Sequence, residues 1–358
     1  MNENFLGQNG FYWFNGVVED RNDPLKTGRV RVRIAGVHTS NKTLLPTADL
    51  PWSLVVLPST ASGISGVGSS PLGLLEGSWV FGFFRDGDMQ QEPVVIGSLP
   101  GYPIELADTR KGFYDPAGIY PRYKDEPDVN RLAVNNEDNP SLSLLLRQAT
   151  RITGVPTADY NTQELADGTV TAASDGTTWN QPAIPYNASY PYNHTYESES
   201  GHIKEFDDTP GHQRIYEAHR TGTSYEIDKD GNKTDIIKGD HYTLTSGGNL
   251  HYIQGNSDVT ISGRHKIYLN KDGLLNNHYD IQVGPNANIN IQVDNGDINL
   301  NTINGRVNVN SGGDYNLKVG GDMTVSVSGS MNTIVEGDNT EDTTGAKIIR
   351  GQTIDLNP

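Results

Sequence analysis

Three carboxylates, Glu205, Asp207 and Asp208, lie close together in the segment KEFDDTPG and could act as an acid pair. Two carboxyl groups hydrolyse a glycosidic bond when one donates a proton and the other acts as base or nucleophile. The same pattern, followed directly by Pro-Gly, is typical of a turn in which Asp side chains accept backbone hydrogen bonds. We favour the turn, and we expect Ile203 and Phe206 to pack inward from it.

A second candidate for chemistry is the alternating run Arg-Val-Arg-Val-Arg at 29–33. Arginines bind phosphates, and stacking faces for bases are offered by the aromatic residues Tyr12, Trp13, Phe14 and Trp52. However, Glu19, Asp20 and Asp23 lie nearby, and a formal net charge of −17 opposes nucleic-acid binding. We therefore interpret the run as structural or as part of a protein-docking surface, and we expect no nucleic-acid partner.

The segment GISGVG at 63–68 resembles a phosphate-binding loop in its glycine content. Such loops bind anions at the N-terminus of the helix that follows them. Here Ser-Ser-Pro follows in place of a helical pattern, so we interpret the segment as a surface loop or as a loop that contacts a partner.

The composition of the chain excludes several other classes of protein. Since none of the 358 residues is cysteine, disulfides, Cys-ligated metals and thiol catalysis are excluded. No run of about 18 apolar residues occurs, and the start MNENFLGQNG lacks the basic and apolar segments of a secretory leader. We expect neither a membrane span nor a leader.

Five short runs rich in β-branched and aromatic residues, each bounded by turn residues, predict five strands before residue 105. They are Phe14–Glu19, Arg29–Ile34, Trp52–Leu57, Ser78–Phe84 and Pro93–Gly97. Closing so few strands into a barrel removes most of the exposed sheet edges. We therefore predict an all-β chain whose residues 1–105 form a five-stranded barrel of the oligonucleotide/oligosaccharide-binding (OB) type.

The middle of the chain has a weaker pattern. Residues 106–195 are rich in Pro, Asn, Asp and Ser and predict an extended linker, with a short helix near 141–152. Residues 196–238 predict a neck that leads into the C-terminal region, 239–358.

The C-terminal region carries an eight-residue repeat. Glycine recurs every eight residues in two series, Gly239, Gly247, Gly255 and Gly263, then Gly305, Gly313, Gly321, Gly329, Gly337 and Gly345. Side chains two, four and six places after the glycine tend to be apolar, and this alternation predicts a strand with one buried side. The predicted core residues are Val259, Ile261, Ile267, Leu269, Val307, Val309, Leu317, Val319, Val325 and Val327. The glycines are the predicted turns.

One eight-residue repeat, which we call an octad, is too short to enclose a core within one chain. It supplies one strand and one bend, whereas single-chain β-helices use roughly twenty residues per coil to build three walls. Three chains that wind together close a prism, with the apolar side chains on its axis. We therefore predict a homotrimer with an intertwined triple-stranded β-helix of roughly 65–70 Å, from roughly 14 octads at about 4.8 Å each.

Histidines are the remaining candidates for metal ligands. None of the nine has a zinc-site spacing, but His251 and His265 fall four and two places after their glycines, where a threefold cluster could hold an ion or water. We favour ordinary packed histidines, and we expect no metal site and no cofactor.

Several segments of the sequence resemble one protein family. The chain is similar to the central spike proteins of contractile phage tails, the tail lysozyme or cell-puncturing family, and to the related VgrG spikes of type VI secretion. The resemblance lies in FNGVVEDRNDPLKTGRVRVRI at 14–34, DLPW at 49–52, GFYDPAGIYPR at 112–122 and ESESGHIKEFDDTPGHQRIYEAHRTGTSYEIDKDGN at 197–232, followed by the octads.

The resemblance implies a location and partners. It implies a protein of the virion tail baseplate, assembled in the bacterial cytoplasm, whose OB barrel docks on a trimeric hub. It also implies that the prism points at the host outer membrane and pierces it when the sheath contracts, and that a PAAR-type protein caps its apex.

The sequence departs from the family at one point. In T-even relatives a lysozyme domain separates barrel and prism, whereas about 90 linker-like residues stand here, too few for a typical domain. NPSLSLLLRQATRI at 139–152 resembles the approach to that domain, but no catalytic helix follows, so we carry over no catalytic residues. Two alternatives stay open: a β-helical tailspike enzyme that cleaves host polysaccharide, and a VgrG-like secretion spike that delivers effectors.

Overall fold

The computed structural model describes residues 11–102, 104, 127–134, 169–171, 178–180, 185–261, 263–269 and 278–354. Among these residues the only α-helix is α1 (Arg131–Val134), so the described part is almost entirely β, as predicted. None of its helices has the length and apolar character needed to cross a membrane. The predicted helix near 141–152 lies outside the described residues. The chain divides into two units, Met1–Tyr268 and Leu269–Pro358, and we describe each by itself.

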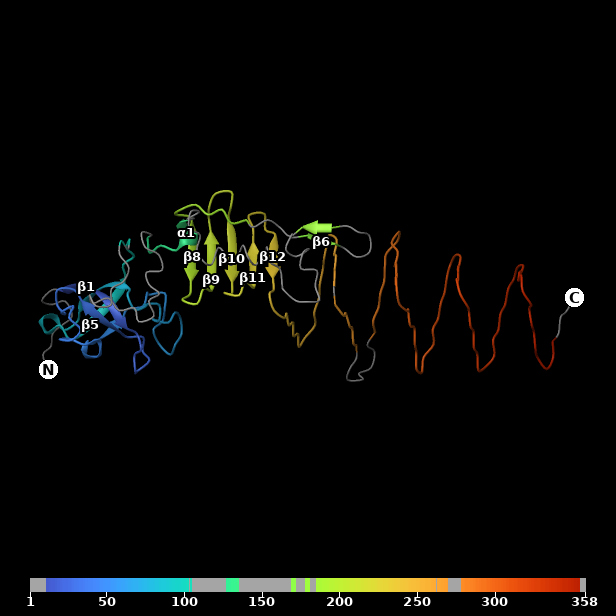
Figure 1. Ribbon diagram of the computed structural model, residues 1–358, viewed down its shortest axis with the longest axis horizontal. Coiled ribbons are helices and arrows are strands. Elements are labelled where there is room, and N and C mark those ends of the chain that lie inside the picture. The colour runs from blue at the N-terminus through green and yellow to red at the C-terminus, as the bar shows by residue number, and fades with distance from the viewer. Residues whose placement is uncertain are drawn as a thin grey trace. The chain divides into compact units, whose positions relative to one another are not determined.

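The N-terminal strands form a closed five-stranded barrel, which confirms the predicted OB-type fold (Figure 1). Around the barrel the order is β1-β2-β3-β5-β4, and only β3 and β5 run parallel. The strands are β1 (Tyr12–Asp20), β2 (Val30–Ile34), β3 (Trp52–Val55), β4 (Trp79–Phe84) and β5 (Pro93–Ser98). Two 3₁₀ turns, Thr47–Asp49 and Gly87–Met89, lie in the connections.

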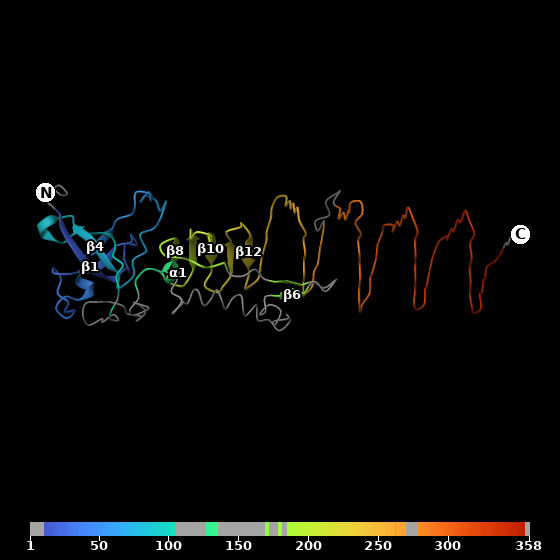
Figure 2. The ribbon, with the colours of Figure 1, turned by 90° about the horizontal axis from the view of Figure 1, so that it is seen from above.

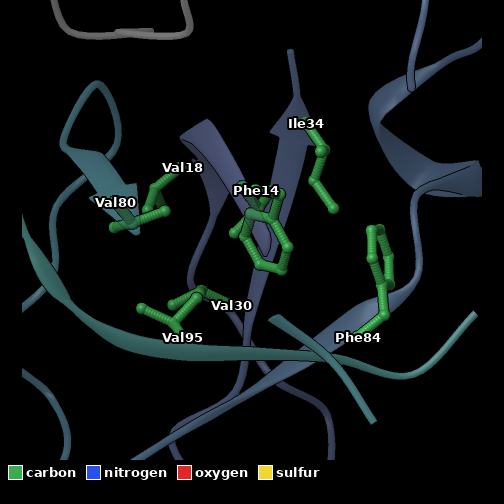
Figure 3. Packing of buried hydrophobic residues seen from close by; sticks show 8 residues of the cluster. Phe14, Val18, Val30, Ile34, Val80, Phe84 and Val95 are labelled. Carbon is green, nitrogen blue, oxygen red and sulfur yellow. The ribbon is translucent and has the colours of Figure 1, made fainter. Parts of the chain in front are cut away.

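The barrel core follows from the alternation of side chains along the strands. Val30, Val32 and Ile34 of β2 point inward, and the arginines between them point out. Figure 3 shows Val30 and Ile34 together with core side chains of the other strands. The fully or almost fully buried cluster consists of Phe14, Val18, Val30, Val32, Ile34, Val80, Phe84 and Val95.

Gly82 lets β1 and β5 approach β4 closely. A Cβ atom at this position would lie 2.1 Å from the carbonyl oxygen of Val94 and 2.7 Å from the ring of Phe14. Any larger side chain would therefore displace either the β5 backbone or a core ring. A Cβ atom added to Gly97 of β5 would have no other atom within 4 Å.

A second sheet follows in the chain, and we call it the neck sheet. Its five antiparallel strands are β8 (Asn193–Glu197), β9 (Ile203–Asp207), β10 (Arg214–Ala218), β11 (Ser224–Ile227) and β12 (Lys233–Ile236). Figures 1 and 2 show them side by side in chain order. Short strands β6 (Thr169–Thr171) and β7 (Thr178–Asn180) pair with each other.

The two sides of the neck sheet have different environments. Ile203 is 5% exposed and packs with Leu132 of α1 and with Tyr216, whereas Phe206 on the same strand is 47% exposed. The expectation that Ile203 and Phe206 pack on one side was wrong, because residues three apart in a strand point to opposite faces. The Phe206 face of the sheet stays open in the single chain.

The octad segment, residues 239–354, contains no helix or strand among its described residues. In Figure 1 its residues 278–354 run back and forth as a single chain, coloured orange to red. The chain bends at each of the ten repeat glycines. The intertwined β-helix requires further chains and stays a prediction.

The close approach at Gly82 gives a direct test of the barrel packing. We expect Gly82→Ala to lower the free energy of unfolding by about 1–3 kcal/mol, because the added methyl group overpacks the core. Gly97→Ala is the matched control and should change it by less than about 0.5 kcal/mol. Chemical denaturation followed by Trp fluorescence measures both. Equal effects of the two substitutions would contradict this account of Gly82.

Candidate functional site

The octad segment is the largest candidate interaction surface of the chain. All of its described residues are exposed. The ten predicted core residues are between 46% exposed, for Leu269 and Val319, and 78% exposed, for Val259. A single chain therefore leaves a long row of apolar side chains in water.

The surface area of the chain leads to the same conclusion. The chain exposes 28552 Å² to solvent, whereas a compact globular protein of this length exposes about 14,000 Å². Apolar surface contributes about 25 cal/mol per Å² when it is buried, so covering even part of the excess strongly favours association. The geometry fits a surface that is completed by other chains.

The first two octads differ from the later ones, which the sequence prediction did not anticipate. After Gly239 and Gly247 most apolar side chains lie three and five places on, at Tyr242, Leu244, Leu250 and Tyr252, and the only apolar residue at an even place is Ile253. Leu244 and Leu250 are 95% and 98% exposed. His251 therefore shares its side of the strand with Asn249, and the even pattern begins at Gly255.

The barrel carries a second exposed apolar surface, which we call the aromatic wall: Phe11, Trp13, Phe81 and Phe83. Side chains of β1 and β4 that point away from the core meet across the two strands, because Trp13 lies opposite Phe83. The Trp13 and Phe81 rings stack with centroids 5.2 Å apart, and Trp13 meets Phe83 edge-on at 5.7 Å. The ring centroids of Phe11 and Phe83 lie 5.1 Å apart.

The aromatic wall has the chemistry of a protein-docking surface. Trp13 is 53% exposed and Phe11 is 42% exposed, although both are large apolar side chains. Large aromatic residues dominate the energetics of protein interfaces. Sequence reasoning noted Trp13 only as a stacking face for bases, since the cluster exists only after β1 and β4 have paired.

The arginines at 29–33 are already engaged within the barrel. Arg29 donates to Asp23 at 2.7 Å, and the buried Arg33 donates through two nitrogens to Glu19 at 2.7 and 3.0 Å. Arg31 donates to the carbonyl of Thr47 and lies with its guanidinium carbon 4.5 Å from the centroid of Trp52. These interactions favour the structural interpretation of the run over phosphate binding.

The carboxylates of the KEFDDTPG segment have different partners. Glu205 is fully buried and is bonded to Arg214, which also donates to Glu226 at 3.0 Å. Asp207 accepts from the backbone N–H of Thr209 at 3.0 Å, which confirms the predicted Asx-type turn. Asp208 lies on the exposed side, 3.6 Å from His194. This arrangement supports a structural role for the segment.

The remaining candidate sites have simple geometries. In the GISGVG loop, Ile64 and Val67 pair across a tight turn and no helix follows, so the loop lacks the geometry of an anion site. His202 and His219 lie with ring centroids 4.5 Å apart, and each accepts a backbone N–H at Nδ1. Over the described ranges, no group of three or more His, Cys, Asp or Glu side chains is placed to hold a metal ion.

Comparisons with known proteins agree with this arrangement. The family described as the Gp5 N-terminal OB domain matches residues 36–173. Protein Gp5 of Vibrio phage KVP40 is 37% identical over 292 residues, which is 74% of this chain and 66% of that protein. The pre-baseplate central spike protein Gp5 of Enterobacteria phage T4 is 44% identical over 119 residues, which is 32% of this chain and 20% of that protein. The matches thus span just under two thirds of the first relative and a fifth of the second.

The Asp23–Arg29 pair predicts a specific dependence on pH. The guanidinium of Arg29, which donates to Asp23, holds the pKa of that carboxyl far below its ordinary value of about 3.9. The native barrel therefore binds fewer protons here than the unfolded chain, and the pair contributes stability above about pH 4 that is lost as the pH falls further. We expect Asp23→Asn to be less stable than the parent at neutral pH and to lose less stability on acidification.

Thermal unfolding between pH 7 and pH 2, followed by Trp fluorescence, measures this difference. Asp49→Asn, which removes an exposed carboxylate of the same barrel, is the control for the loss of one negative charge. A parent and an Asp23→Asn variant with parallel stability curves would refute the role assigned to the pair.

Proposed function

We propose that this chain, which is similar to the Gp5 central spike proteins of phages, is a homotrimeric, non-enzymatic spike of the virion tail baseplate. Its OB barrel docks on a trimeric hub protein, and its octad segment forms a β-helical needle that pierces the host outer membrane. The observation that carries this proposal is the row of octad side chains that one chain leaves exposed.

Winding of three chains around one another would give the octad segment both backbone hydrogen-bond partners and a buried apolar core. The backbone N–H and C=O groups of each extended octad gain partners from neighbouring chains, and the apolar side chains meet on a common axis. A dimer provides two walls and leaves one side of that axis open to water. The bends at the glycines let each chain pass from one wall of the prism to the next.

The neck sheet supports the same assembly. On its open face, Phe206, Ile215 and Ile227 lie directly opposite one another on β9, β10 and β11 and form an apolar row across three strands. Phe206 and Ile215 are exposed in the single chain. In the proposed trimer the three open faces turn toward one axis and bury these rows.

The aromatic wall supports docking of the barrel on the hub. Its four aromatic rings contact one another, and Arg29 and Arg33, which could recognise nucleic acid, are paired with Asp23 and Glu19. Protein interfaces typically have such aromatic residues at their centre. We propose that the hub covers Trp13 and Phe83.

The proposed action of the spike is mechanical. Continuous main-chain hydrogen bonding around a dry axis makes the needle stiff, because bending would break several ladders at once. The spike concentrates the force of sheath contraction on a small area of membrane. A PAAR-type protein would cap the apex. The engagement of Glu205 and Asp207 within the neck sheet supports a spike without its own hydrolase activity.

Substitutions in one octad test the trimer. We expect the parent to sediment as a trimer and Val325→Asp to sediment as a monomer or to melt far below the parent, because three carboxylates would share a dry axis. Ser326→Asp is the matched control, since its side chain lies on the opposite side of the same strand. Analytical ultracentrifugation measures the state of each. A monomeric parent, or equal behaviour of the two variants, would exclude the proposed prism.

Substitutions in the aromatic wall test docking separately. We expect Trp13→Ser and Phe83→Ser each to weaken binding to the purified hub trimer by about 30-fold or more, which corresponds to about 2 kcal/mol for a residue at the centre of an interface. Arg85→Ala, which removes an exposed ion pair with Glu92 on the same barrel, should change the affinity little. Isothermal titration calorimetry with the trimeric spike gives the constants, and unchanged affinity in both wall variants would place the docking surface elsewhere.

A further inference from the structure

The last octads interrupt the apolar pattern of the segment. In the octads that begin at Gly313 and Gly321, the places two, four and six after the glycine are all apolar, namely Tyr315, Leu317, Val319, Met323, Val325 and Val327. After Gly337 the same places hold Asn339, Glu341 and Thr343, and after Gly345 the first of them holds Lys347. The axial side of the strand therefore becomes polar at one level near the end of the repeat.

The two charged residues of this polar layer contact each other. Lys347 forms an ion pair with Glu341, although they belong to successive octads. The side chains of Lys347 and Glu341 are 48% and 58% exposed in the single chain. The apolar residues that precede them on the same side are exposed too. Both members of the pair therefore lie in the row that the proposed trimer buries.

A regular repeat creates a problem of register that this layer can solve. If one chain slides by eight residues relative to its neighbours, most glycines of the series from Gly305 to Gly345 still meet glycines, and most apolar side chains still meet apolar side chains. Sheets with a uniform pattern are prone to such slippage. A slip of one octad, however, places the charges of the polar layer beside apolar side chains of the neighbouring chains.

We infer that Glu341 and Lys347 form a register lock of the trimer, an ionic layer on the axis that fixes the three chains at one mutual stagger. The inference rests on the proposed homotrimer. In the correct stagger the three Glu341 and three Lys347 side chains lie at neighbouring levels and neutralise one another. In any slipped stagger, carboxylates and ammonium groups are buried with incomplete partners, which is strongly unfavourable.

The energetics distinguish a lock from a simple stabilising contact. Replacing a buried ion pair by apolar residues of similar size is often neutral or stabilising, whereas removing one partner leaves an unpaired buried charge. Single polar core positions in coiled coils fix register at a cost in stability. A lock therefore predicts that neutralising both residues preserves the trimer but relaxes its stagger.

Interchain cross-linking in a chain without natural cysteine measures the stagger directly. Val335 and Thr343 occupy the same place, six after the glycine, in successive octads. Isotope-labelled chains with Val335→Cys are co-folded with unlabelled chains that carry Thr343→Cys, and the mixed trimers are oxidised. Mass spectrometry then counts the disulfides that join position 335 of one chain to position 343 of another, and those that join two identical positions. The cross-linking ratio is the first number divided by the second.

We expect the double substitution Glu341→Leu with Lys347→Met to raise this ratio about tenfold, since the penalty on slipped trimers is removed, while the trimer melts at or above the parent temperature. The charge swap Glu341→Lys with Lys347→Glu should keep the parent ratio. Lys347→Met alone should lower the melting temperature of the trimer. Asp342→Leu, on the opposite side of the same strand, is the matched control and should leave the ratio unchanged.

Sedimentation of each variant separates the two levels of the argument. A trimeric double variant whose cross-linking ratio equals that of the parent would overturn the register lock and leave the proposed spike intact. A parent that does not sediment as a trimer would overturn both.

Discussion

The structure depends on one constraint, which is that an eight-residue repeat cannot bury its own apolar side. Each octad provides one short extended segment and one bend, so it does not cover its own apolar side. The predicted core residues therefore remain open to water in the single chain. In the proposed trimer the hydrophobic effect acts between chains, and folding of this region and association are one process.

The N-terminal barrel solves the same problem within one chain. Its five strands close on themselves, and a continuous cluster of buried side chains fills the interior. The barrel leaves the aromatic wall on β1 and β4 partly exposed, whereas its arginines are paired with acids. One chain thus combines a self-sufficient domain suited to docking with a segment that is incomplete alone.

Buried charges recur at the places where this chain must adopt one arrangement. Glu19 and Arg33 tie the connection after β2 to the barrel, and Arg214 joins Glu205 and Glu226 across three strands of the neck sheet. Such pairs contribute little net stability compared with apolar packing, but a misaligned strand would leave them unpaired. The proposed ionic layer at Glu341 and Lys347 follows the same physical rule between chains.

The sequence by itself determined the local structure of the barrel and the resemblance to a family. Alternation predicted the five barrel strands, and the motifs at 14–34 and 197–232 identified the central spike proteins, because short-range patterns depend only on backbone geometry and turn chemistry. The tertiary structure decided which side chains meet. It paired the arginines with acids and assembled the aromatic wall across two strands. These contacts depend on strand register and on residues distant in the chain, which no local pattern encodes.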